Sequence, residues 1–469
     1  MALPLSRLAS AIIAAWVLFF VSSDPANAER KPNILFIISD DQGYSDFGFT
    51  GNPAIQTPVL DQLAAESAVF ENFVVAAACS PSRAAFLTGR EHLSTGVWGV
   101  PKRDNLHPDE ALMPAWFKKA GYATFYAGKR DMGRPPYTTP WERGWDQGYF
   151  VSGYQHRNPR LHNRGDTIEP EGWTCDIMTD LILDFWKANT DLPKLAIAAY
   201  VIPHLPFVLD ESFAQPYLDA GLSHEIALCY GSITQMDTAI GRLLEGLRAN
   251  SEEEDTIVVF VSDNGMSTKA TAKDGSRTEW TESDWKIRNH HGLSGAKAWA
   301  WENGIRVPCL IKWPGVITPG KRPQLGGAED ILPTLLDLSG IDPASVEHHP
   351  FAGVSLRPAL EDPAAKFERP DLLRIAISGT GSARELAEGE TRNFEDHHLV
   401  LRGPRFKYHA LPGGESALYD LTADPGEIHD RQSEFPEVAA KMAKELRARW
   451  DALLATGRAF HLREDAPER

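Results

Sequence analysis

Two unbroken apolar segments restrict the fold of this chain more than any other sequence feature. The first covers residues 32–41 and ends in two aspartates, and the second covers residues 255–265 and ends in an Asp-Asn-Gly turn. An all-apolar strand without alternation is typical of a parallel strand that helices cover on both faces. We therefore expect an α/β fold: a large mixed, mainly parallel sheet sandwiched by helices.

The polar side chains at the two strand ends form one candidate site. They are Asp40, Asp41, Asp263 and Asn264. Ligands of open α/β sheets bind beyond the carboxyl ends of the strands. Oxygen donors suit calcium or magnesium better than zinc. Either pair alone could equally be a helix cap or a turn, but two such pairs in one chain favour a divalent cation.

A helix start follows Cys79 and places a reactive group beside it. Ser80 is a favourable N-cap, Pro81 suits the first helical position and Gly89 predicts the end of the helix. A helix N-terminus lowers the pKa of a nearby thiol and binds oxyanions. Arg83, about one turn in, can direct its charge to the same place. The residues alone also allow a small buried cysteine in a turn.

The pattern Cys-x-Pro-Ser-Arg-x-x-x-Leu-Thr-Gly-Arg at residues 79–90 resembles the signature of the type I sulfatases, members of the alkaline-phosphatase-like superfamily. This resemblance implies that a formylglycine-generating maturation enzyme oxidises Cys79 to formylglycine. The hydrated aldehyde would then attack the sulfur of a sulfate ester. The resemblance also implies that the four oxygen-bearing residues bind one calcium ion, which touches the modified Cys79.

Three further segments, residues 121–129, 203–207 and 295–308, are similar to sulfatase blocks that contain active-site cations. Taken singly, a lysine or histidine is more often a solvated or structurally satisfied group. The resemblance implies that Lys129 and Lys297 hold sulfate oxygens as point charges, and that His204 protonates the leaving alcohol.

One position departs from the family pattern. Where sulfatases usually carry Trp-His-x-Gly after the first lysine, residues 130–133 read Arg-Asp-Met-Gly. The histidine that accepts a proton from the formylglycine hydrate in relatives is thus replaced by Asp131. Asp131 could itself be the base, His290 or His291 could replace the missing group, or the protein could be slow or inactive. Arg130 could also pair with Asp131 in a simple salt bridge.

The chain start predicts export. Residues 1–28 combine a short cationic start, an apolar region at residues 9–21 and an Ala-x-Ala cleavage site at residues 26–28, which together indicate a signal peptide. The apolar region is too short for a comfortable membrane span. We expect a periplasmic or secreted protein without a membrane anchor after cleavage. The formal net charge of −17 argues against nucleic-acid partners, so a local basic pocket must capture the sulfate.

Two domains follow the predicted signal peptide: a catalytic domain at residues 29–368 and an α+β subdomain at residues 369–469. In the second, residues 399–409 predict a hairpin, and a helix that starts at Pro436 follows the next strand. Cys175, Cys229 and Cys309 lack zinc-ligand spacing, and we expect buried free thiols. Two polar segments are expected at the surface: a solvated loop at residues 152–164 and an insertion at residues 268–289.

The sequence therefore predicts an exported, calcium-dependent sulfatase whose substrate is a sulfated small molecule or saccharide. Two alternatives remain. A phosphatase or phosphonate hydrolase of the same superfamily would share the motif. A sulfated-glycan-binding protein that has lost catalysis would explain Asp131.

Overall fold

The computed structural model describes residues 31–99, 106–130, 139–151, 153–377 and 393–456. The predictions for the signal peptide at residues 1–28 and for Asp131 lie outside these residues.

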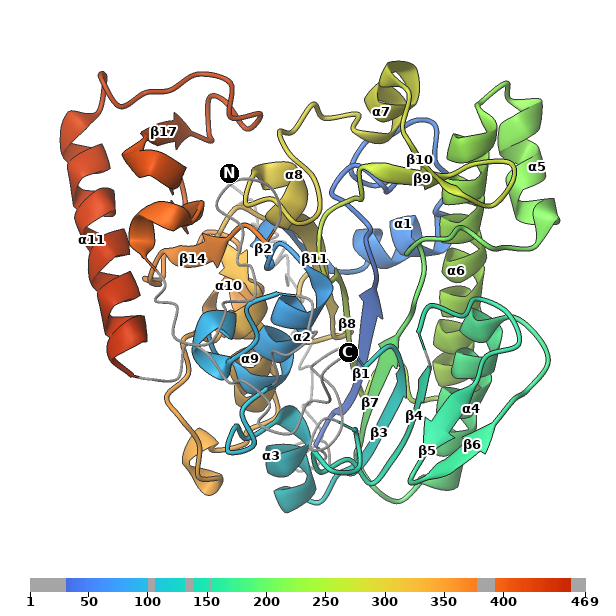
Figure 1. Ribbon diagram of the computed structural model, residues 1–469. Coiled ribbons are helices and arrows are strands. Elements are labelled where there is room, and N and C mark those ends of the chain that lie inside the picture. The colour runs from blue at the N-terminus through green and yellow to red at the C-terminus, as the bar shows by residue number, and fades with distance from the viewer. Residues whose placement is uncertain (1–30, 100–105, 131–138, 152, 378–392, 457–469) are drawn as a thin grey trace, which may run out of the picture.

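One large mixed sheet forms the centre of the molecule (Figure 1). Its strands are β1 (Asn33–Ser39), β2 (Ala68–Val74), β3 (Ala123–Gly128), β4 (Gln147–Val151), β5 (Leu161–Asn163), β6 (Asp166–Ile168), β7 (Lys194–Ala199), β8 (Thr256–Ser262), β11 (Arg306–Lys312), β12 (Gly320–Arg322) and β13 (Gly326–Gly327). The order is β12-β2-β11-β8-β1-β7-β3-β4-β5-β6, and β13 also pairs with β2. The central strands β8, β1, β7, β3 and β4 are mutually parallel, which confirms the predicted fold class.

Helices cover both faces of this sheet. The helices of this part of the chain are α1 (Pro58–Ala65), α2 (Cys79–Thr88), α3 (Met113–Lys119), α4 (Thr174–Ala188), α5 (Glu211–Asp219), α6 (His224–Ala249), α7 (Glu282–Arg288), α8 (Glu302–Ile305), α9 (Ile331–Leu338) and α10 (Arg357–Glu361). The core on one face includes residues of α2, α3 and α9, and the core on the other includes residues of α1, α4 and α6 (Figure 1).

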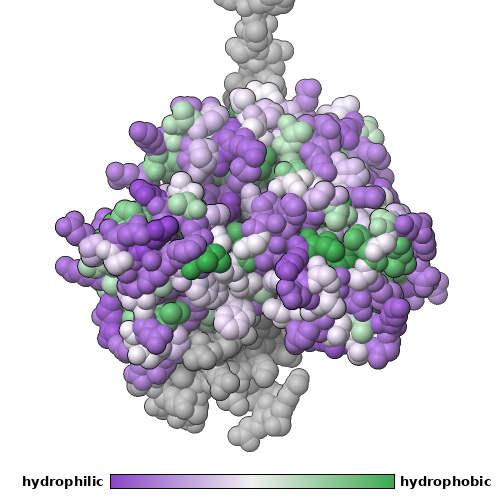
Figure 2. Space-filling view, turned by 90° about the horizontal axis from the view of Figure 1, so that it is seen from above, coloured by the Kyte–Doolittle hydropathy of each residue, from purple (hydrophilic) through white to green (hydrophobic). Residues whose placement is uncertain are grey.

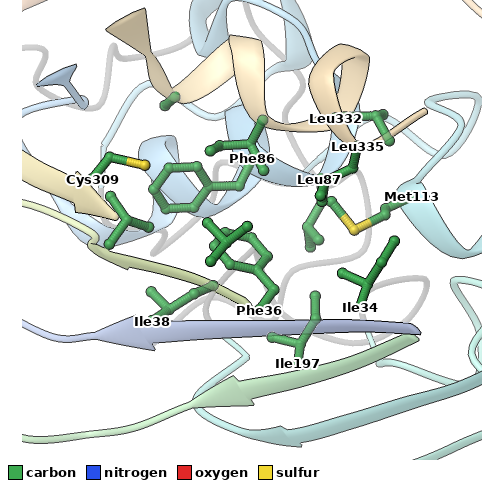
Figure 3. Close-up of a cluster of buried hydrophobic side chains, with 14 of the residues drawn as sticks. Ile34, Phe36, Ile38, Phe86, Leu87, Met113, Ile197, Cys309, Leu332 and Leu335 are labelled. Carbon is green, nitrogen blue, oxygen red and sulfur yellow. The ribbon is translucent and has the colours of Figure 1, made fainter. Parts of the chain in front are cut away.

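Strand β1 shows why its sequence has no polar alternation. Ile34, Phe36 and Ile38 belong to the core on the α2 and α9 face, whereas Leu35 and Ile37 belong to the core on the other face. Figure 3 shows Phe36 beneath Phe86 of α2, and the two rings meet edge to face at 5.5 Å. Burial of each such side chain stabilises the fold by about 1.5–3 kcal/mol, so this packing fixes α2 above the sheet.

Helix α2 begins two residues earlier than the sequence indicated. Ala78 is the N-cap and Cys79 is the first helical residue, so Ser80 and Pro81 lie inside the first turn and Ser80 does not cap the helix. Pro81 is tolerated there because the first N–H groups of a helix have no intrahelical acceptor. Gly89 ends the helix in the left-handed conformation, with φ of 66°, as predicted.

The C-terminal part forms a separate antiparallel sheet with one long helix. Its elements are β14 (Leu372–Ile375), β15 (Leu399–Arg402), β16 (Phe406–Ala410), β17 (Ser416–Asp420) and α11 (Pro436–Ala455). Met442, Leu446 and Trp450 of α11 pack on this sheet, which confirms the predicted hairpin, strand and helix. A further two-stranded sheet joins β9 (Lys269–Thr271) and β10 (Arg277–Glu279).

Most of the surface in Figure 2 is hydrophilic, with hydrophobic residues in small separate groups. Within the described residues, no helix combines the length and the apolar character that crossing a bilayer requires. Cys175, Cys229 and Cys309 are buried free thiols, as predicted. The prediction of a solvated loop at residues 152–164 is wrong in part, because His156 and Leu161 are buried and β5 lies in this segment.

Candidate active site

The two predicted strand ends meet. Strands β1 and β8 are neighbours in register, with Ser39 opposite Ser262, so the residues that follow each strand emerge at the same level. The Asp41 N–H donates to Oδ1 of Asp263 at 3.3 Å, and the Asn264 amide donates to Oδ1 of Asp41 at 2.8 Å. All of these side chains are buried. The predicted cluster of oxygen donors is therefore present at the carboxyl edge of the sheet.

Asp41 holds an unusual backbone conformation, with φ of 65°. This region costs an ordinary residue of order 1–3 kcal/mol, so the surroundings must impose it. The Asp41 carbonyl accepts a hydrogen bond from Arg288 at 3.2 Å, and Arg288 pairs with Asp46 at 3.0 Å. Arg288 is fully buried at the end of the predicted surface insertion, and its sequence context gave no indication of this role.

Two buried oxygens in the cluster have no hydrogen-bond partner among the described residues: Oδ1 of Asp40 and Oδ1 of Asn264. Such atoms are rare because leaving a buried polar group unpaired is costly. Burial, together with the nearby Asp40 carboxylate, raises the pKa of Asp263 to about 6. Ligand atoms of Asp40, Cys79 and Asp263 lie within 4.8 Å of one another. This donor set fits a hard divalent cation.

Arg83 fills the space between these carboxylates and the helix start. Its Nε and Nη2 both lie 2.8 Å from Oδ2 of Asp263, and its Nη1 donates to the Lys129 carbonyl at 2.9 Å. The side chain is 1% exposed. Although burial opposes it, the Asp263 carboxylate raises the pKa of Arg83, and Cys79 is close enough to contribute. The predicted convergence of Arg83 and Cys79 is therefore present.

Lys129 follows β3 through a glycine that the packing requires. Gly128 has φ of 118°, and a Cβ there would lie 1.9 Å from the Ala199 carbonyl oxygen. That same oxygen accepts the Lys129 N–H at 2.8 Å, which fixes the end of β3 against β7. The Lys129 ammonium lies 2.7 Å from Oδ2 of Asp40. A buried positive charge thus borders the oxygen cluster.

Lys297 contacts a different carboxylate of the cluster, with Nζ 2.5 Å from Oδ1 of Asp41. Its N–H donates to the Met266 carbonyl, and the next residue, Ala298, donates to the Ala77 carbonyl. Ala298 also has a positive φ, 74°. Although burial opposes it, the Lys297 ammonium holds the pKa of Asp41 well below its usual range.

His204 lies at the edge of the cluster, with Nε2 3.8 Å from Oδ2 of Asp41. Nδ1 is 2.7 Å from the Leu205 carbonyl, so this nitrogen carries the hydrogen and Nε2 faces the site. Burial, together with the positive charges of Lys297 and Lys129, lowers the pKa of His204 to about 3 against the effect of Asp41. The ring of Tyr154 stacks on the imidazole, a contact that the sequence did not predict.

The histidines considered as substitutes for the missing family residue are engaged elsewhere or exposed. Nδ1 of His291 lies 2.9 Å from Oγ of Ser45, and Nε2 lies 2.9 Å from the Thr50 carbonyl. His290 is exposed. Both ring nitrogens of His291 are thus already hydrogen-bonded, which disfavours it as the base. Asp131 lies outside the described residues.

Comparisons with known proteins identify the family of this chain. The family model "Sulfatase" matches residues 32–341. Human N-acetylgalactosamine-6-sulfatase is 29% identical over 92% of this chain and 87% of its own length. Bovine arylsulfatase A is 30% identical over 95% of this chain and 93% of its own length. The ulvan-active sulfatase of Formosa agariphila is 30% identical over 84% of this chain and 76% of its own length.

Solved structures match the fold. Ps i-CgsB in complex with k-i-k-neocarrahexaose has a TM-score of 0.74 at 24% identity, over 90% of this chain and 93% of that one. The PsFucS1 sulfatase from Pseudoalteromonas sp. has a TM-score of 0.72 at 20% identity, over 94% of this chain and 93% of that one. The chain therefore belongs to the sulfatase family, within the alkaline-phosphatase-like superfamily, and is a sulfuric ester hydrolase.

Proposed function

We propose that this protein is an exported, calcium-dependent sulfatase that hydrolyses sulfate esters of a sulfated carbohydrate through a formylglycine made from Cys79. One observation carries the proposal. Three carboxylates, an amide oxygen and three cations from separate segments converge beside Cys79, and Oδ1 of Asp40 and Oδ1 of Asn264 have no hydrogen-bond partner among the described residues.

The proposed calcium ion would be held by the oxygen-bearing residues that follow β1 and β8, together with the modified side chain at position 79. These residues are Asp40, Asp41, Asp263 and Asn264. Calcium prefers carboxylate and carbonyl oxygens, and the two buried unpartnered oxygens are what such an ion would require. When bound, it supplies positive charge that offsets the charge of the sulfuryl group.

The cations have separable roles. Arg83 is locked by Asp263 and by the Lys129 carbonyl, so it supplies a fixed charge beside position 79. The ammonium groups of Lys129 and Lys297 each contact a carboxylate of the cluster, and their positive charge attracts sulfate oxygens. Charge stabilisation of this kind, from preorganised donors, is commonly the largest catalytic contribution.

His204 is the proposed general acid. Because its Nδ1–H donates to Leu205, Nε2 is the nitrogen that can take up a proton and pass it to the leaving alcohol, and binding of the anionic sulfate ester favours this protonated form. The hydrate of formylglycine at position 79 would supply one hydroxyl as the nucleophile and a second hydroxyl that loses its proton as the carbon–oxygen bond to sulfate breaks and the aldehyde re-forms. A plain serine lacks that second hydroxyl.

The relatives support a carbohydrate substrate. Their names refer to N-acetylgalactosamine 6-sulfate and ulvan, and one matching structure contains k-i-k-neocarrahexaose. Export follows from the predicted signal peptide at residues 1–28, and conversion of Cys79 requires the formylglycine-generating maturation enzyme as a partner.

The test combines mass spectrometry with an activity screen. The peptide that contains Cys79 should carry an aldehyde in active protein, and sulfated saccharides should be cleaved while matched phosphate esters are not. Removal of calcium with a chelator should abolish turnover, and added calcium should restore it. Full activity with an unconverted thiol would overturn the proposed nucleophile. Faster cleavage of phosphate esters would favour the phosphatase alternative, and tight glycan binding without turnover in converted protein would favour the binding protein.

A further inference from the structure

The aromatic ring of Tyr154 lies flat on the His204 imidazole. The ring centroids are 3.6 Å apart and the planes differ by 4°. The same ring lies 4.8 Å from the Lys129 ammonium. Lys129 and His204 follow different strands, β3 and β7, which are neighbours in the sheet. One side chain from a third segment therefore contacts two residues to which the proposed function assigns different tasks.

The backbone around Tyr154 is anchored to the start of helix α4. The carbonyl of Gln155 accepts from Oγ1 of Thr174 at 2.7 Å, and the carbonyl of His156 accepts from the Thr174 N–H at 2.9 Å. His156 itself is buried. A helix that packs in the core thus holds this segment in place, and the position of the Tyr154 ring is set by the fold.

The imidazole of His204 needs a second constraint. The hydrogen bond from Nδ1 to the Leu205 carbonyl fixes one edge of the ring but leaves rotation about that bond open. A flat aromatic contact on the ring face removes this rotation. Both constraints together hold Nε2 3.8 Å from Oδ2 of Asp41, at the border of the oxygen cluster.

We propose that Tyr154 is a positioning residue for His204, which fixes the imidazole plane so that Nε2 faces the oxygen of the leaving alcohol. This inference rests on the proposed role of His204 as general acid. Proton donation matters most when the leaving alcohol is a strong base, as a sugar hydroxyl is. Tyr154 would therefore be needed for poor leaving groups and nearly dispensable for good ones.

The test compares two aryl sulfates of similar shape: phenyl sulfate, and 4-nitrophenyl sulfate, whose leaving group is a much weaker base. Tyr154→Ala should lower kcat on phenyl sulfate by about 10–100-fold, because misplacement of a catalytic group by about 1 Å can cost about 100-fold. The loss on 4-nitrophenyl sulfate should be only a few-fold, and KM should change less than kcat. Tyr154→Phe keeps the ring that contacts His204 and should therefore keep the wild-type ratio between the two substrates.

Two controls complete the test. Tyr149→Ala removes another half-buried tyrosine, on β4, and should not change the ratio between the substrates. His204→Ala should show the same dependence on the leaving group as Tyr154→Ala, and more strongly.

Three results would overturn the inference: equal loss on both substrates in Tyr154→Ala, an effect on KM alone, or a Tyr154→Phe variant as impaired as Tyr154→Ala. If His204→Ala itself shows no dependence on the leaving group, the proposed role of His204 fails and the inference fails with it. If His204→Ala shows the dependence and Tyr154→Ala does not, only the inference about Tyr154 fails.

Discussion

Two clusters of buried charge in this protein have similar composition but differ in how fully their carboxylate oxygens are paired. The active-site cluster surrounds Asp40 and Asn264. The second, which we call the junction cluster, joins α8 to the C-terminal sheet. Its members are Glu302, Arg402, Lys407, His409 and Glu427. These five side chains are at most 4% exposed, so both clusters face the same desolvation cost.

In the junction cluster every carboxylate oxygen has a partner. Oε1 of Glu302 lies 3.1 Å from Lys407, and Oε2 lies 3.4 Å from Arg402. Oε1 of Glu427 pairs with Lys407 at 2.8 Å, and Oε2 accepts the Glu302 N–H at 2.6 Å. In the active-site cluster, Oδ1 of Asp40 has no hydrogen-bond partner among the described residues. Complete pairing indicates a structural role, and open oxygen atoms indicate a place for a ligand.

The junction cluster is also linked to the active site. It holds α8, which follows the segment that carries Lys297. The Ile377 N–H, just after β14, donates to the Ala298 carbonyl at 2.9 Å. The C-terminal sheet therefore supports the backbone beside Lys297.

The largest effect on stability is expected at the junction cluster. Lys407→Met leaves Glu302 and Glu427 facing each other without their shared cation, and removal of one partner from a buried pair costs about 3–5 kcal/mol. The free energy of unfolding from urea titration measures this loss. Lys321→Met, which removes an exposed lysine paired with Glu71, is the matched control and should cost less than about 1 kcal/mol. Equal midpoints for the two variants would contradict the structural role.

The reverse pattern is expected at the active-site cluster. Asp40→Asn keeps an acceptor for Lys129 but removes one of three crowded carboxylates, so the free energy of unfolding should change little. Its kcat/KM should fall by about 100–1,000-fold, or about 2.7–4 kcal/mol, the usual cost of losing one preorganised charge-stabilising group. Glu302→Gln in the junction cluster should instead lower stability and leave the kcat/KM of folded protein nearly unchanged. Similar losses of unfolding free energy in Asp40→Asn and Glu302→Gln would contradict the assignment of a functional role to one cluster and a structural role to the other.

A smaller effect is expected from pH. Nε2 of His398 lies 2.9 Å from Nδ1 of His409. Burial lowers the pKa of His398 to about 3, with contributions from His409 and Lys407. The unfolded chain takes up this proton near pH 6.5, so stability is full above that pH and falls as the pH drops toward 3. Between pH 6.5 and 4.5 this one residue should cost roughly 2 kcal/mol.

The measurement is the difference in unfolding free energy between the wild type and His398→Asn across that pH range. A comparison of this kind is needed because His92 and His156 also have pKa values that burial lowers to about 4. The variant should lose less stability on acidification than the wild type. Parallel pH curves would show that His398 does not contribute.

The sequence alone determined the central strands, the fold class and the polar residues that converge at the sheet edge. Continuous apolar runs identify doubly covered strands, and residues that directly follow parallel strands must emerge at one edge. For Lys129, His204 and Lys297 the strand-end pattern was insufficient, and the resemblance to sulfatases supplied the prediction.

Only the tertiary structure decided the contacts made by Tyr154 and Arg288, the start of α2 at Cys79, and the junction cluster. Tyr154 contacts His204 across 50 positions of sequence, and Arg288 contacts Asp41 across 247. No local periodicity or cap signal encodes partners at such separations. A residue's neighbours in sequence set its strand or helix, whereas packing of distant elements sets which buried charges are paired and which oxygens stay open for a ligand.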